Sequence, residues 1–211
     1  MKDKKTTSII IAILSLLIAS AMVYGAVKKS ESDSEKYKGW KTYENKEAGF
    51  SLKYPASFVI YEDEIKKPKE YQYPKEIIFA SRPRPERPGM NIETYVDRKG
   101  YAIVVDSWEN QKSLTLEEWL RPNVLENIKK QKNHEIKVVG QRAFIAKRHA
   151  GELYTLDVDF VTKDKYFSIY LIPLILEKSF DKYPEYKNRY EDSVKNLYLM
   201  LESFKLIEKS K

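Results

Sequence analysis

The sequence predicts an α+β fold in which an antiparallel β-sheet is flanked by helices, preceded by one N-terminal transmembrane helix. Three observations support this prediction: several segments rich in β-branched and aromatic residues, two segments with helical periodicity, and one uncharged apolar run near the N-terminus. The strands come in blocks rather than alternating singly with helices, which favours an antiparallel sheet. The 211 residues are enough to bury a core in one domain or two small ones.

An uncharged run of 19 residues, from Ile9 to Val27, predicts a membrane anchor. As a helix it would rise about 28 Å, close to the thickness of a hydrocarbon core. The alternative is a cleaved signal peptide and a secreted, soluble protein, because Ala19-Ser20-Ala21 resembles a cleavage site. We favour the anchor, since the apolar run continues to Lys28. The residues expected to contact the lipid bilayer are Ile9, Ile10, Ile11, Ile13, Leu14, Leu16, Leu17, Ile18, Met22, Val23 and Val27.

The chain is expected to divide into a charged N-terminus (1–8), the anchor (9–27), a polar linker (28–38) and one α+β domain (39–208). Long domains cross membranes largely regardless of their charge, so we expect this domain outside the cytoplasm. Residues 66–90 hold five prolines, and the end of this stretch is expected to be a surface loop. Its arginines, Arg82, Arg84 and Arg87, are candidates for contact with a partner or an acidic lipid.

The predicted strands share β-branched and aromatic content: Gly49–Tyr54, Phe58–Glu62, Ile77–Ser81, Tyr101–Ser107, Ile136–His149, Glu152–Thr162, Lys165–Ile172 and a short final strand from Phe204. The clearest hairpin turns at Lys163-Asp164. In the strand before that turn, apolar residues alternate with Thr155, Asp157 and Asp159, so these three share the other face. Gly140 is expected to form a bulge or tight bend within a single strand.

Two helices are predicted. The first has a capping box, with Thr115 as N-cap and Glu118 three residues later, and runs towards Lys130. Pro122 is expected to kink this helix or to start a second turn. The second helix spans Glu185 to Ser203. Its apolar residues recur at helical spacing in the stripe Tyr186, Tyr190, Val194, Leu197 and Leu201.

Composition excludes several functions. The chain has no cysteine, so it forms no disulfide and no thiolate metal site. The net charge is +7, but residues 1–29 carry +4 of it, and lysines and glutamates intermix elsewhere. A nucleic-acid-binding protein normally concentrates basic residues on one face, so we expect no nucleic-acid partner.

Short motifs along the domain resemble the PsbP-like family. Its opening residues Asn45, Gly49, Phe50, Ser51, Tyr54, Pro55 and Phe58 match the family's start, and Ser203-Phe204-Lys205 is similar to its usual ending. Ser113–Leu120 and Val139–Ala143 resemble the middle helix and the strand that follows it. The resemblance implies an α/β/α sandwich and a binding or assembly role, because most members resemble non-enzymatic modules.

The sequence offers few candidates for chemistry. It lacks the glycine-rich nucleotide-binding motifs and the nucleophile elbow of hydrolases. His149, Asp157 and Asp159 form a conceivable metal site, but we expect a solvated sheet face there. The carboxylate pairs Asp157/Asp159 and Glu117/Glu118 are interpreted as surface charge. We therefore predict no catalytic, cofactor-binding or metal-binding residue.

The function expected from these observations is a non-catalytic binding or assembly role at the cell envelope, with another protein or an envelope component as partner. The alternative is an extracytoplasmic hydrolase or small-molecule-binding domain, which would reveal itself by a deep pocket with converging titratable groups.

Overall fold

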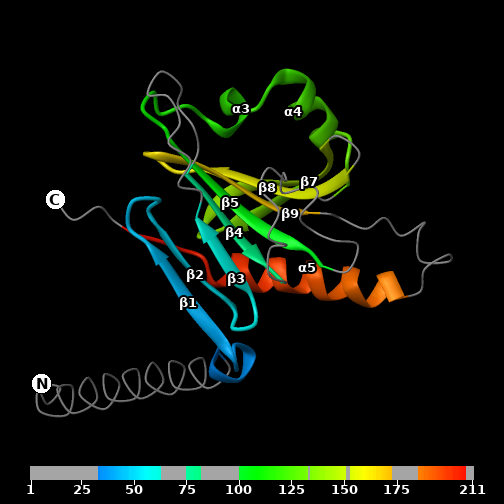
Figure 1. Cartoon of the computed structure of the whole chain (residues 1–211). Coiled ribbons are helices and arrows are strands. Elements are labelled where there is room, and N and C mark those ends of the chain that lie inside the picture. Colours follow the sequence, from blue (N-terminus) through cyan, green and yellow to red (C-terminus); the bar gives the residue numbers. More distant parts are fainter. Residues whose placement is uncertain are drawn as a thin grey trace, which may run out of the picture. The chain divides into compact units, whose positions relative to one another are not determined.

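The computed structural model describes residues 33–62, 75–81, 100–132, 134–150, 153–172 and 185–207 (Figure 1). The chain divides into two compact units, Met1–Trp40 and Lys41–Lys211. The predicted anchor (9–27) and the predicted contact residues Arg82, Arg84 and Arg87 lie outside the described residues. Within the described ranges, none of the helices combines the length and apolarity that crossing a membrane requires.

The larger of two sheets contains the predicted meander. Its seven strands are antiparallel and lie in the order β3 (Val59–Glu62), β4 (Lys75–Ala80), β5 (Ala102–Glu109), β9 (Lys165–Ile172), β8 (Leu153–Val161), β7 (Gln141–Ala150) and β6 (Glu135–Val138). The α+β class and the antiparallel pairing agree with the prediction. The turn between β8 and β9 falls at the predicted Lys163-Asp164, since Thr162 N–H donates to the carbonyl of Lys165 at 2.7 Å.

A smaller sheet of three strands was not predicted as separate. It consists of β1 (Trp40–Asn45), β2 (Phe50–Pro55) and β10 (Lys205–Leu206), with β2 in the middle. Strand β1 was not predicted either, because only Tyr43 and Asn45 of its six residues are buried. That pattern is too short for a reliable two-residue periodicity.

The prediction of one strand over Ile136–His149 is wrong. Val138 pairs with Gln141, so Val139 and Gly140 form a two-residue turn between β6 and β7. Both have positive φ, 51° and 76°, as in the mirror-image turns that suit the twist of a hairpin. Gly140 therefore reverses the chain instead of bending a single strand.

Pro122 separates the predicted first helix into α3 (Leu116–Trp119) and α4 (Pro122–Lys129). The predicted capping box is present, since Glu118 N–H donates to Thr115 Oγ1 at 3.4 Å and Thr115 N–H donates to Glu118 Oε2 at 2.7 Å. Arg121 is extended, with ψ of 143°, because proline disfavours the helical conformation in the residue before it. Pro122 then occupies the first turn of α4, where its missing N–H costs nothing.

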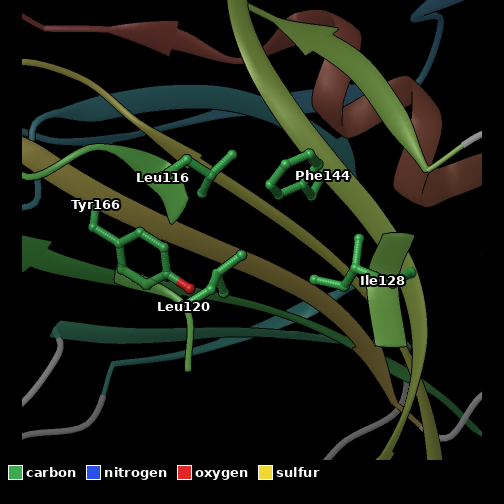
Figure 2. Packing of buried hydrophobic residues seen from close by; sticks show 6 residues of the cluster. Leu116, Leu120, Ile128, Phe144 and Tyr166 are labelled. Atoms are coloured by element: carbon green, nitrogen blue, oxygen red, sulfur yellow. The ribbon is translucent and has the colours of Figure 1, made fainter. Parts of the chain in front are cut away.

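The C-terminal helix, α5 (Glu185–Ser203), has the predicted bounds. It lies on one side of the large sheet, and α3 and α4 lie on the other (Figure 1). On the α3–α4 side, Leu116, Leu120 and Ile128 pack against Phe144 of β7 and Tyr166 of β9 (Figure 2). The large sheet is thus covered on both faces.

The start and the end of the domain meet in the core. Phe50 of β2 stacks on Phe204, with ring centroids 5.1 Å apart and an angle of 13° between the ring planes. Lys53 N–H donates to Ser203 Oγ at 2.8 Å. The two motifs that resemble the ends of PsbP-like domains therefore form one structural unit.

Candidate functional site

Asp157 and Asp159 belong to a buried polar cluster, defined here with Arg148 and Tyr166. Arg148 on β7 forms an ion pair with each aspartate of β8, and its Nη1 lies 3.1 Å from Asp157 Oδ2. Tyr166 OH of β9 donates to Asp159 Oδ1 at 2.5 Å. Asp159 is 0% exposed and Asp157 is 9% exposed. The expectation of surface charge on a solvated face is therefore wrong, although the predicted alternation of faces is correct.

The helices α3 and α4 cover this face of the sheet, and they explain why the two aspartates are buried. In the strand register Asp159 stands opposite Phe144, and Tyr166 lies beside it, and both of these aromatic residues belong to the apolar cluster under α3 and α4. When polar and apolar residues alternate along a strand, the polar face of the sheet is normally solvated. Here helices pack on that face and exclude water from it. The aspartates then need partners within the protein, and Arg148 and Tyr166 provide them.

Burial dominates the electrostatics of the polar cluster. Desolvation raises the pKa of Asp157 to about 6, although the positive charge of Arg148 opposes the shift. The pKa of Tyr166 is raised by burial and next by the negative charge of Asp159. Asp157 Oδ1 and Arg148 Nε are buried and make no hydrogen bond. The charged groups mainly engage one another, so we assign no catalytic residue here.

Metal binding finds no support in the described part of the chain. No group of three or more His, Cys, Asp or Glu residues there has the geometry to hold a metal ion. The side chain of His149 lies outside the described residues, so the predicted set of His149, Asp157 and Asp159 is not tested.

The other carboxylate pair, Glu117 and Glu118, is used for structure. Glu118 closes the capping box, and its hydrogen bonds with Thr115 lower its pKa. Glu117 pairs with Arg142, which also pairs with Glu135 of β6. The prediction of surface charge is correct for this pair, since Glu118 is exposed and Glu117 is partly exposed in its ion pair with Arg142.

A shallow apolar hollow of about 410 Å³ lies between β6 and the C-terminal part of α5. We call its lining the edge surface; it consists of Ile136, Lys137, Val138, Val139, Tyr198, Leu201, Glu202 and Phe204. Val139 is 40% exposed and Tyr198 is 42% exposed. Large apolar side chains that gather around a hollow at the surface mark contact sites more often than scattered ones do.

Val139 adds backbone strain to the edge surface. Its φ of 51° is a conformation that β-branched residues rarely adopt, whereas asparagine and glycine adopt it readily. Strain of this kind persists where the rest of the structure imposes it, and it clusters at functional sites. The strained and exposed Val139 therefore supports the edge surface as a candidate functional site.

A larger and more polar hollow of about 710 Å³ lies beside the β8–β9 turn. Its buried cation, Lys165, is already engaged, because its Nζ donates to the carbonyl of Glu47 at 3.0 Å and to Glu109 Oε1 at 2.9 Å. The remaining lining residues are Gly49, Asn110, Gln111, Ser113, Thr162, Lys163, Asp164, Phe167, Leu206 and Ile207. Its volume is within the range of small-molecule sites.

The edge surface was not predicted from the sequence. Tyr198 lies next to the predicted apolar stripe of α5 but outside it, and Val139 was assigned to the interior of a strand. A two-residue turn normally has asparagine or aspartate before the glycine, so Val139 concealed the turn at Gly140.

No family model matches the chain. The curated proteins contain no match either. Among the solved structures, the solution structure of cyanobacterial PsbP (CyanoP) from Synechocystis sp. PCC 6803 matches with a TM-score of 0.42 and 14% identity, over 80% of this chain and 92% of that one. The chain is similar in fold to a PsbP.

A crystal structure from Bacteroides thetaiotaomicron VPI-5482 matches with the same TM-score of 0.42 and 11% identity. The match covers 82% of this chain and 50% of that chain, so this chain spans half the length of the Bacteroides protein. At these identities the similarities to PsbP and to the Bacteroides protein concern the fold alone.

Proposed function

We propose that the protein is a membrane-anchored binding module, in which a PsbP-like α/β/α domain outside the cytoplasm contacts another protein or an envelope component without catalysis. The observation that carries the binding role is the edge surface, where Val139 and Tyr198 expose apolar area beside a hollow. The uncharged run 9–27 supports the anchor.

Two features of the edge surface favour a protein partner. Its lining is mostly apolar, with Lys137 and Glu202 as its charged members, which suits a contact that combines apolar burial with a few oriented charges. It also adjoins β6, the last strand of the large sheet in the described chain, whose outer side has no strand beside it. An open sheet edge is a ready template for a further strand.

The anchor and the orientation are tested on membranes from cells that express the full chain. We expect the chain to remain in the pellet after alkaline extraction and to become protease-sensitive from the outer side in spheroplasts. N-terminal sequencing distinguishes the secreted alternative, because cleavage near Ala21 would remove the first residues and release the protein.

The edge surface is tested by replacing Tyr198 with the photoreactive residue p-benzoylphenylalanine in the full chain. Lys187, which is exposed nearer the start of α5, receives the same replacement as the matched control. Irradiation of intact membranes is expected to give a discrete adduct from position 198 and none from position 187. Equal adducts from both positions, or none from either, would contradict the proposed surface.

The small-molecule alternative is supported by the volume of the hollow beside the β8–β9 turn. A thermal-shift screen of the full chain with small metabolites tests it. A saturable increase in melting temperature that Lys165→Met abolishes would favour this alternative. The predicted contact of Arg82, Arg84 and Arg87 stays a separate proposal, tested by their joint replacement with glutamine and the same membrane cross-linking.

A further inference from the structure

No strand of the described residues pairs with the outer side of β6, and this side has a defined hydrogen-bonding pattern. Ile145 N–H donates to the carbonyl of His134 at 2.8 Å, so His134 directs its backbone groups towards β7. In an antiparallel pair, every second residue of a strand directs its N–H and C=O groups to the same neighbouring strand. The backbone groups of Ile136 therefore also point towards β7. The N–H and C=O groups of Glu135 and Lys137 therefore point to the open side of the sheet.

Only a few registers let this edge pair with a second copy of itself. Antiparallel pairing of the outward groups places Glu135 opposite Glu135, Lys137 opposite Lys137, or Glu135 opposite Lys137 of the second copy. The first two registers put like charges face to face, which is unfavourable. The third places opposite charges face to face twice, with Ile136 opposite Ile136 on the two-fold axis.

The surroundings of Lys137 favour this third register. Within its own hairpin Lys137 stands opposite Arg142, a second cation, and it has no ion pair with any described residue. Glu135, by contrast, is held by Arg142, with 2.6 Å between Arg142 Nη2 and Glu135 Oε1. The carboxylate of Glu135 is thus fixed beside the strand and is still partly exposed, so it is positioned to receive a lysine from a second copy.

We propose that two copies of this chain associate through β6, antiparallel, with Glu135 of each copy opposite Lys137 of the other. A two-fold axis perpendicular to the sheet keeps both apolar hollows on the same face, where Val139 and Tyr198 of each copy border the joint. A four-residue edge is weak by itself. Anchoring both copies in one membrane raises their effective concentration, so this inference rests on the proposed function.

The test uses single cysteines in the full chain in its membrane, which is practical because the protein contains no cysteine. In the proposed register the two copies of residue 136 are a non-hydrogen-bonded pair with Cα atoms about 4.5 Å apart, within disulfide range. The two copies of residue 135, or of residue 137, are offset by two residues and lie about 8 Å apart, outside that range.

Under mild oxidation we expect Ile136→Cys to form at least about fivefold more disulfide-linked dimer than Glu135→Cys or Lys137→Cys, because only its geometry suits a disulfide. Lys112→Cys, exposed after β5, is the control for random collision. A maximum at position 135 or 137 would contradict the register. Equal, low yields at all four positions would overturn self-association through β6.

A charge exchange gives a second readout. Lys137→Glu in the Ile136→Cys background places glutamates opposite each other and is expected to reduce the dimer by about fivefold or more. Adding Glu135→Lys restores opposite charges and is expected to recover the yield. Loss without recovery would contradict the proposed pairing, and circular dichroism of each variant verifies that it folds.

Failure of this inference is distinguishable from failure of the proposed function. If position 198 gives an adduct with another protein while Ile136→Cys gives no dimer, the binding role stands and the second copy is not the occupant. If neither position reacts above its control, both proposals fall.

Discussion

At the scale of single residues, Val139 is the most unusual position. A left-handed backbone costs a non-glycine residue about 1–2 kcal/mol, and the β-branch adds to the difficulty. Its side chain recovers little of this cost, because it is 40% exposed. A residue that tolerates the left-handed conformation should therefore stabilise the fold at this position.

Replacing Val139 with asparagine is expected to raise the free energy of unfolding by about 1 kcal/mol, because asparagine tolerates the left-handed conformation. Urea unfolding of the full-length chain measures the change. Val139→Thr keeps the β-branch and serves as the control, with no gain expected. Unchanged stability of the asparagine variant would show that the turn is not strained.

Gly49 is a second residue with a positive φ, 80°, and it also lacks space. A Cβ atom at this position would lie 3.0 Å from Cε of Lys165, whose ammonium group holds the carbonyl of Glu47. Glycine is therefore favoured here for two reasons: it adopts the left-handed conformation, and it leaves room for the side chain of Lys165.

We expect Gly49→Ala to lower the free energy of unfolding by about 2–3 kcal/mol, of which about 1 kcal/mol is the backbone cost. Gly140→Ala isolates that cost, since φ there is 76° and nothing lies within 4 Å of the added Cβ. The two variants are compared by urea unfolding. Equal losses would mean that Lys165 moves aside freely.

At the scale of elements, the break between α3 and α4 shows how local signals position a helix pair. Thr115 caps the start of α3. Leu120 and Arg121 are extended after α3, and Pro122 then starts α4. Neither helix is long enough to be stable alone. Both depend on the apolar cluster that they form with the sheet, where Trp119 stacks on Tyr166 with centroids 4.7 Å apart.

Thr115→Ala removes the side-chain acceptor of the capping box and is expected to cost about 1 kcal/mol of unfolding free energy. Thr115→Ser retains the acceptor and is expected to be nearly neutral. Hydrogen exchange of the amides of α3 locates the effect, since Glu118 N–H loses its partner. Protection that is unchanged in the alanine variant would contradict a stabilising role of the cap.

At the scale of the whole molecule, the polar cluster connects three adjacent strands beneath a helical cover. Asp157 keeps its carboxyl group in a desolvated place, and its raised pKa means that the folded chain binds a proton there more tightly than the unfolded chain does. The stability from this proton is fully present below the unfolded pKa, near 3.8, and is lost as the pH rises through about 6.

Asp157→Asn is expected to remove that dependence. The difference in unfolding free energy between the wild type and this variant should change by on the order of 2–3 kcal/mol between pH 4 and pH 6.5, with the wild type relatively more stable at the acid end. Urea unfolding at several pH values measures it. Asp192→Asn, an exposed substitution on α5, is the control. A difference that stays constant with pH would disprove the raised pKa.

The elements that the sequence predicted well are those specified by nearest neighbours along the chain. In the stripe of α5, the cap at Thr115 and the turn at Lys163-Asp164, each residue is at most four positions from the next residue of the same pattern. The prediction of one strand over Ile136–His149 failed because local preference does not indicate the turn inside it. A valine in a left-handed turn contradicts its local preference, so only the pairing of Val138 with Gln141 reveals the turn.

By itself, the sequence determined the α+β class, the antiparallel hairpin, the N-cap at Thr115 and the bounds of α5, because hydrophobic periodicity and capping residues act over short distances. Tertiary structure alone decided that Asp157 and Asp159 are buried, that Phe50 meets Phe204, and that β6 ends the sheet beside Tyr198. Periodicity tells which residues share a face, but whether that face meets solvent depends on segments that pack on it from far along the chain.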